Sequence, residues 1–140
     1  MTNEKKRTFG LFVAVLLAAG AVWLLTRTAG GRGGSAVTIR VEADGAVILE
    51  EALDADARFV VADGTVRRVR DDRTTQDLLE DAAGQAQAVN IIELRGGKAY
   101  CAASNCPNQI CVHTQAITRE AHDTPIVCLP HRLTIYAVAD

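Results

Sequence analysis

The amino-acid sequence predicts an all-β domain, a small antiparallel barrel or sandwich with one short helix, behind an N-terminal transmembrane helix. Three features support this fold class. About eight short runs of β-type residues are separated by turn residues at near-regular spacing. Helical patterning is limited to one segment, and a single long apolar run lies near the N-terminus. The length of 140 residues fits one domain with short appendages.

The apolar run, residues 9–25, contains 17 residues without a charge. As a helix it would be about 25 Å long, which is the short end of a membrane span. Lys5, Lys6 and Arg7 precede the run and favour a cytoplasmic N-terminus. The predicted organisation is a cytoplasmic start (1–8), a signal-anchor (9–25), a glycine-rich linker (26–35) and an extracytoplasmic β domain (36–140).

Two alternatives for the apolar run are a cleaved signal peptide, since a basic start and small residues also suit one, and a buried core helix. The anchor is favoured because the run is longer than a usual signal core, because Trp23 is bulky near its end, and because no clean A-x-A site follows. We therefore expect a single-pass protein of the cell membrane whose C-terminal domain lies outside the cytoplasm.

The charge balance excludes one class of partner. Residues 35–140 contain ten Lys and Arg against sixteen Asp and Glu, a formal charge of −6. Nucleic-acid-binding domains normally carry a basic face, so we expect no nucleic acid. The expected partners are the membrane and another envelope protein.

Alternation and turn dipeptides define the first half of the domain. Val37, Ile39 and Val41 alternate with polar residues, and Asp44-Gly45 supplies a hairpin turn. Asp63-Gly64 is a second such turn. The expected elements are strands at 37–42, 47–49 and 59–62, an exposed edge strand at 65–70, and a short helix at 74–83 that could equally be a loop within an insertion (63–87).

The second half contains a further hairpin and the last strands. The dipeptide Gly96-Gly97 separates two β-type runs, and three prolines fall at strand borders. The expected strands are 89–94, 98–102, 110–113, 126–129 and 133–138, with Pro107, Pro125 and Pro130 at the borders.

The cysteines follow the spacing C-x4-C-x4-C-x16-C, and outside the membrane they are candidates for disulfides. If strands 110–113 and 126–129 pair antiparallel, Cys111 lies opposite Cys128 at a bridgeable separation. Cys101 and Cys106 would then pair with each other or stay reduced. Four cysteines allow three full pairings, and the sequence does not choose among them.

Metal sites are the alternatives to disulfides. Four thiolates, or a mixture of them with His113 and His131, could coordinate zinc, but this is disfavoured because the C-x2-C knuckles of structural zinc sites are missing. A Rieske [2Fe-2S] centre is the sharper alternative, since Cys111 and His113 form C-x-H while Cys128 and His131 form C-x2-H. The glycines usual after such ligands are missing. We therefore expect no metal and no cofactor.

Catalysis is not expected either. A catalytic Cys/His pair needs a third, orienting group that the sequence does not indicate, and thiol–disulfide exchange usually employs C-x-x-C. We expect no catalytic residues and no enzymatic activity. The favoured function is a binding or accessory module, and the alternative is a redox protein with a Rieske-like cluster or a reversible disulfide.

The segments CPNQICV (106–112) and IVCLPHRLTI (126–135), with NIIELRGGK (90–98), resemble NusG domain II-like proteins. The resemblance implies a compact β-rich domain, often in small membrane-anchored proteins outside the cytoplasm, and no settled biochemical activity. No role in transcription is expected, because neither of the other NusG modules is evident. Gln115, where glycine is usual, and the extra Cys101 depart from the pattern. The motif residues are Cys106, Pro107, Cys111, Val112, Cys128, Leu129, Pro130 and His131.

Overall fold

The computed structural model describes residues 16–21 and 36–139. Residues 16–21 are helical. Within the described ranges, no helix is long and apolar enough to cross a membrane. Most of the predicted signal-anchor at 9–25 lies outside these ranges, so it stays a prediction.

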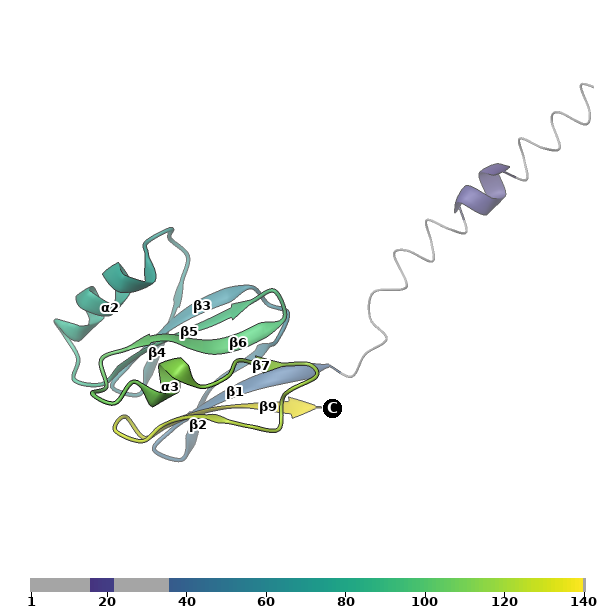
Figure 1. Cartoon of the computed structure of the whole chain (residues 1–140). Coiled ribbons are helices and arrows are strands. Elements are labelled where there is room, and N and C mark those ends of the chain that lie inside the picture. The colour runs from purple at the N-terminus through teal and green to yellow at the C-terminus, as the bar shows by residue number, and fades with distance from the viewer. Residues whose placement is uncertain (1–15, 22–35, 140) are drawn as a thin grey trace, which may run out of the picture. The chain divides into compact units, whose positions relative to one another are not determined.

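The β domain consists of two antiparallel sheets and two short helices (Figure 1). Sheet A has the strand order β2-β1-β9-β8, and sheet B has the order β4-β3-β5-β6-β7. The expectation of a mostly β, antiparallel domain is confirmed. The elements are β1 (Val37–Ala43), β2 (Ala46–Ala52), β3 (Ala57–Ala62), β4 (Thr65–Val69), α2 (Thr75–Ala83), β5 (Val89–Arg95), β6 (Lys98–Ser104), α3 (Ile110–His113), β7 (Ile117–Thr118), β8 (Ile126–Cys128) and β9 (Leu133–Ala139).

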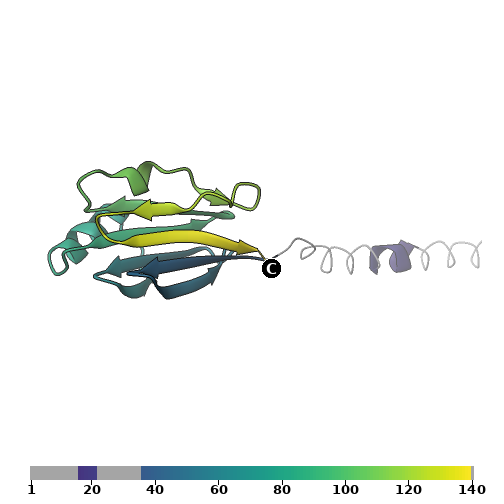
Figure 2. The same cartoon turned by 90° about the horizontal axis from the view of Figure 1, so that it is seen from below.

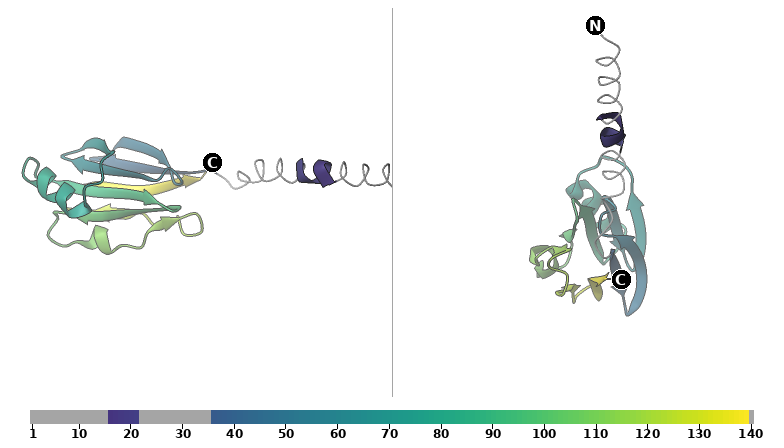
Figure 3. Two further views of the ribbon diagram at one scale, coloured as in Figure 1. Left: turned by 90° about the horizontal axis from the view of Figure 1, so that it is seen from above. Right: turned by 90° about the vertical axis from the view of Figure 1, so that its right-hand side faces the viewer.

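The main core lies between the two sheets. Ile39 and Val41 of β1 and Ile135 of β9 belong to the same buried cluster as Phe59 of β3 and Ile92 of β5. Strand β1 alternates buried and partly buried residues along its whole length, as expected for a strand with one face on a core. The strands of both sheets lie along roughly the same axis (Figures 2 and 3), as in an aligned sandwich.

A second, smaller core covers the outer face of sheet B. Helix α2 contributes Leu78 and Ala82, which pack with Ile91 of β5. Because β5 has a core on both faces, residues 89–94 are all buried, the polar residues Asn90 and Glu93 included. The predicted helix is confirmed, and the stretch 63–87 provides β4 and the helix that covers the sheet.

Helix α2 begins at a reciprocal cap. The Thr74 hydroxyl accepts a hydrogen bond from the Asp77 amide at 3.1 Å, and the Asp77 carboxylate accepts one from the Thr74 amide at 3.2 Å. Removing the hydroxyl leaves an amide of the first turn without its partner. Thr74→Ala should lower the free energy of unfolding by about 1 kcal/mol, measured by urea denaturation.

Thr124→Ala is the control for this cap, because Thr124 is an exposed loop residue. It should change the free energy of unfolding by less than about 0.5 kcal/mol. Equal effects of the two substitutions would show that the cap does not stabilise the domain.

Two expectations for the last third of the chain are wrong. Residues 110–113 form the helical turn α3, and β8 pairs with β9 instead of with these residues. The turn forms because the Gln109 carbonyl accepts hydrogen bonds from the amides of Val112 and His113, both at 3.2 Å. Strand β7, which the sequence did not predict, pairs with β6.

Candidate functional site

The four cysteines lie where the two sheets meet at one edge of the domain. Strand β8 is the edge strand of sheet A, and α3 contacts both β8 and β6 of sheet B. Cys101 comes from β6, Cys106 from the loop after it, Cys111 from α3 and Cys128 from β8. Each is at most 2% exposed. Segments of both sheets therefore meet around one buried group of sulfurs.

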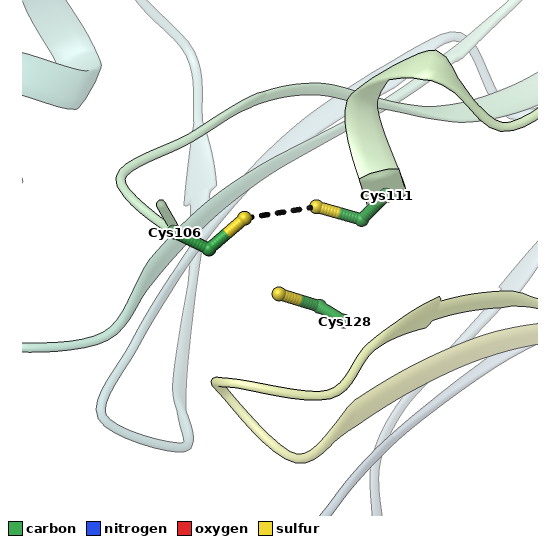
Figure 4. A group of neighbouring side chains, drawn as sticks. All are labelled: Cys106, Cys111 and Cys128. Carbon is green, nitrogen blue, oxygen red and sulfur yellow. Dashed lines mark hydrogen bonds between the residues drawn. The ribbon is translucent and has the colours of Figure 1, made fainter. Parts of the chain in front are cut away.

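Three of the sulfurs point toward one another (Figure 4). The Sγ atoms of Cys106, Cys111 and Cys128 all lie within 4.8 Å of one another, and those of Cys106 and Cys111 are 3.6 Å apart. We call these three residues the thiol cluster. All four cysteines are free thiols in the structure, so neither of the predicted bridges is formed. The cluster nevertheless includes the predicted pair Cys111 and Cys128.

Cys101 lies beside the thiol cluster without belonging to it. Its thiol donates a hydrogen bond to the Ala103 carbonyl at 3.4 Å, and the Asn90 side-chain amide donates to its sulfur at 3.6 Å. The predicted pairing of Cys101 with Cys106 therefore has no counterpart in the grouping of the sulfurs.

The loop that carries Cys106 is held by the next side chains of the motif. Gln109 has a left-handed backbone conformation with φ of 54°. Its side-chain amide donates hydrogen bonds to the carbonyls of Ser104 and Cys106, at 2.6 and 2.5 Å. The Asn108 side-chain oxygen accepts from the Ile110 amide at 3.3 Å. Local hydrogen bonds thus fix Cys106 and Cys111 relative to each other.

A polar network centred on Asn90 surrounds the sulfurs. The Asn90 side-chain amide donates to Ser104 Oγ at 3.1 Å and to Cys111 Sγ at 3.7 Å. The Asn90 side-chain oxygen lies 2.7 Å from His131 Nδ1, a separation at which the ring N–H donates to it. This tautomer leaves His131 Nε2 without a proton in the neutral ring.

The buried surroundings shift the pKa values in opposite directions. Burial raises the pKa of the Cys101 thiol, and burial together with the neighbouring charge of Cys101 raises the pKa of Cys111. For Cys106, burial acts upward, but hydrogen bonds from Ser104 and Cys111 act against it and hold its pKa below the usual value. Burial also lowers the pKa of His131. Of Cys101, Cys106 and Cys111, Cys106 is therefore the first to ionise.

The ligands of the alternative Rieske centre, Cys111, His113, Cys128 and His131, are not brought together as one group. Among the described residues, the group of His, Cys, Asp or Glu side chains close enough to hold a metal ion consists of the three cysteines of the thiol cluster. His113 is exposed on α3, and its Nδ1 lies 2.8 Å from the Gln109 carbonyl. His131 is near the cluster, but its Nδ1 is engaged by Asn90. The arrangement does not fit a [2Fe-2S] centre held by two cysteines and two histidines.

The remaining motif residues frame the cluster. Pro107, Leu129 and Pro130 are exposed, whereas Val112 packs against the main core. The prolines thus lie in the loops beside the cysteines, as the sequence indicated.

Sequence reasoning missed the polar residues around the sulfurs: Asn90, Ser104 and Gln109. A signal existed for the first of them. Asn90 occupies the same face of β5 as Ile92 and Leu94, which belong to the main core, and a polar residue in such a position needs buried partners. No comparable signal marks Gln109, because its role depends on its left-handed backbone conformation.

Comparison with known protein families identifies the family of this domain. A family model described as NusG domain II matches residues 11–140. A DUF1312 family protein from Enterococcus faecalis is 23% identical, with 74% of this chain and 98% of that chain covered and a TM-score of 0.50. The solution structure of a Listeria innocua protein is 19% identical, with 77% of each chain covered and a TM-score of 0.53. At these identities the structural likeness shows the fold alone. Among curated proteins, none matches the chain.

Proposed function

The chain belongs to the NusG domain II family, and we propose that it is a membrane-anchored accessory module that binds another envelope protein outside the cytoplasm. The apolar run at 9–25, preceded by Lys5, Lys6 and Arg7, supports the anchor and its orientation. The formal charge of −6 over residues 35–140 supports a protein partner over a nucleic acid. No catalytic activity is assigned to the domain.

The observation that carries this proposal is the burial of the cysteines between the two sheets. Cys106, Cys111 and Cys128 are each at most 2% exposed, so a substrate cannot reach their sulfurs without opening of the fold. Reactive cysteines are normally partly exposed, whereas buried ones are inert. The thiol cluster is therefore structural, and it fixes the end of sheet A to the loop after sheet B.

Exposed apolar side chains beside the cluster support a binding role. Ile110, at the start of α3, is 60% exposed, and Leu129, directly after β8, is 76% exposed. Helix α3 contacts β8, so both residues flank the same part of the domain. Exposed apolar residues that gather in one region are typical of interaction surfaces.

Thiol reactivity tests the structural role. In the reduced full-length chain under native conditions, iodoacetamide should alkylate the four cysteines at least about 100-fold more slowly than in denaturant, because reaction requires opening of the fold. Mass spectrometry after timed quenching measures each site. Thr124→Cys is the control, since it places a thiol on an exposed loop and should react at the unfolded rate. If Cys106 in the native chain reacts as fast as this control, the thiol cluster does not have the proposed structural role.

A redox module is the second candidate, and one distance favours it. The sulfurs of Cys106 and Cys111 are 3.6 Å apart, close enough to form a disulfide after a small movement. The two thiols would pass two electrons and two protons to a partner disulfide, which would leave as a dithiol. Fast native alkylation of Cys106, together with a Cys106–Cys111 disulfide formed by oxidised glutathione, would support this function over the structural one.

A further inference from the structure

We propose that Cys106, Cys111 and Cys128 bind a single zinc ion that links the two sheets. This inference rests on the structural role proposed for the thiol cluster and names the group that joins its sulfurs. It concerns the reduced chain.

The spacing of the sulfurs fits metal coordination. Zinc–sulfur bonds of about 2.3 Å at tetrahedral angles separate the sulfurs by about 3.8 Å. The sulfurs of Cys106 and Cys111 are 3.6 Å apart, and all three of the cluster lie within 4.8 Å of one another. A disulfide would require one pair to approach to about 2.05 Å and would leave the third sulfur unused. A metal ion uses all three with little rearrangement.

Three separate segments deliver these ligands. Cys106 comes from the loop after β6, Cys111 from α3, and Cys128 from β8 in the other sheet. Because the ligands come from three segments, no C-x2-C knuckle is required in the sequence. Hydrogen bonds from Gln109 fix the loop, and the pairing of β8 with β9 fixes Cys128. The folded domain therefore preorganises the site.

Side-chain amides that donate hydrogen bonds to the sulfurs favour the thiolate form of the cysteines. The Asn90 amide donates to Cys111 Sγ at 3.7 Å, and the Gln109 amide donates to Cys106 Sγ at 3.9 Å. Such donors around ligand atoms stabilise the charge of a metal site and orient its ligands.

The charge of the buried site favours a divalent ion. Three thiolates with Zn²⁺ leave one net negative charge, whereas with Cu⁺ they leave two, and buried charge without compensation is costly. The two amide donors offset part of the charge that remains with zinc. The three sulfurs would leave the fourth tetrahedral position to a non-protein ligand such as water, as in sites with three protein ligands.

Metal titration of the reduced full-length chain tests this inference. After treatment with a chelator and a phosphine reductant, the chain should bind one zinc ion, measured by competition with a chromophoric chelator and by native mass spectrometry. Bound Co²⁺ should give a near-ultraviolet thiolate charge-transfer band with the intensity of three sulfur ligands. Each of the substitutions Cys106→Ser, Cys111→Ser and Cys128→Ser should lower the zinc affinity by at least about 100-fold.

Cys101→Ser is the matched control, because Cys101 is equally buried but outside the cluster. It should change the zinc affinity by no more than about threefold. Circular dichroism of each metal-free variant shows whether it is folded, and the cobalt spectrum of the unchanged chain decides the ligand number if a variant is not.

Two outcomes would overturn the zinc site: no zinc binding by the reduced, folded chain, or a cobalt spectrum without thiolate bands. A Cys101→Ser effect as large as that of Cys111→Ser would also overturn the three-cysteine assignment. These outcomes leave slow native alkylation unchanged, so a failure of the zinc site is distinguishable from a failure of the structural role.

Discussion

Asn90→Ala should lower the free energy of unfolding by about 3 kcal/mol. Asn90 is 1% exposed, and its side chain satisfies Ser104 Oγ and His131 Nδ1, at 3.1 and 2.7 Å. The substitution removes one partner from the buried Ser104 hydroxyl and one from the partly buried His131 ring, and it opens a small cavity in the core. A buried donor or acceptor that loses its partner costs about 1–3 kcal/mol, and the cavity adds to that cost.

Urea denaturation of the reduced full-length chain, followed by circular dichroism, measures this effect. The control is Asn108→Ala, because Asn108 is exposed and loses only its contacts with the Ile110 amide at 3.3 Å and the Cys106 thiol at 3.6 Å. It should cost no more than about 1 kcal/mol. If Asn90→Ala costs as little as the control, the polar network does not hold the thiol cluster in place.

Most of the fold could be predicted from local sequence patterns. The turns Asp44-Gly45, Asp63-Gly64 and Gly96-Gly97 all have positive φ at both residues, and each joins two paired neighbouring strands. Such turns match the twist of the strands beside them, which is why these dipeptides are strong hairpin signals. Helix α2 was likewise predictable from its cap, and the family resemblance drawn from the cysteine motifs is confirmed by the match over residues 11–140.

The site was less predictable, because it depends on contacts between distant segments. Residues 110–113 have β-type composition, and only the left-handed conformation of Gln109 turns them into α3. The four cysteines could be recognised as a group, but their spacing does not say that Cys101 is left out. Cys101 is left out because α3 packs against β6 and β8 and brings Cys111 to Cys106 and Cys128. No local sequence pattern encodes this packing.

Glu93 is a buried carboxylate on the outer face of sheet B, away from the cysteines. It is 6% exposed. Its oxygens accept hydrogen bonds from Thr75 at 3.0 Å and Tyr100 at 2.8 Å, and Oε1 lies 2.8 Å from Nε of Arg58. Burial acts to raise the pKa of Glu93, but the hydrogen bonds from Tyr100 and Thr75 and the charge of Arg58 hold it below the usual value.

Glu93→Gln should therefore destabilise the domain by about 3 kcal/mol at pH 7, because it leaves the partly buried charge of Arg58 without its partner. Since the carboxyl pKa is lower in the folded state, the contribution of Glu93 is complete above the pKa of the unfolded carboxyl and is lost as the pH falls through the folded value. The difference in the free energy of unfolding between the unchanged chain and Glu93→Gln should thus shrink in acid. Urea denaturation across this pH range measures it.

Glu120→Gln is the control for Glu93, since Glu120 is exposed on a loop and should change the free energy of unfolding by less than about 0.5 kcal/mol. A Glu93→Gln difference that stays constant into acid would mean that ionisation of Glu93 does not stabilise the fold. The lost stability would then come from the shape and hydrogen bonds of the side chain, which glutamine reproduces only in part. A difference that disappears in acid instead shows that the contacts of the ionised carboxylate with Tyr100, Thr75 and Arg58 stabilise the fold.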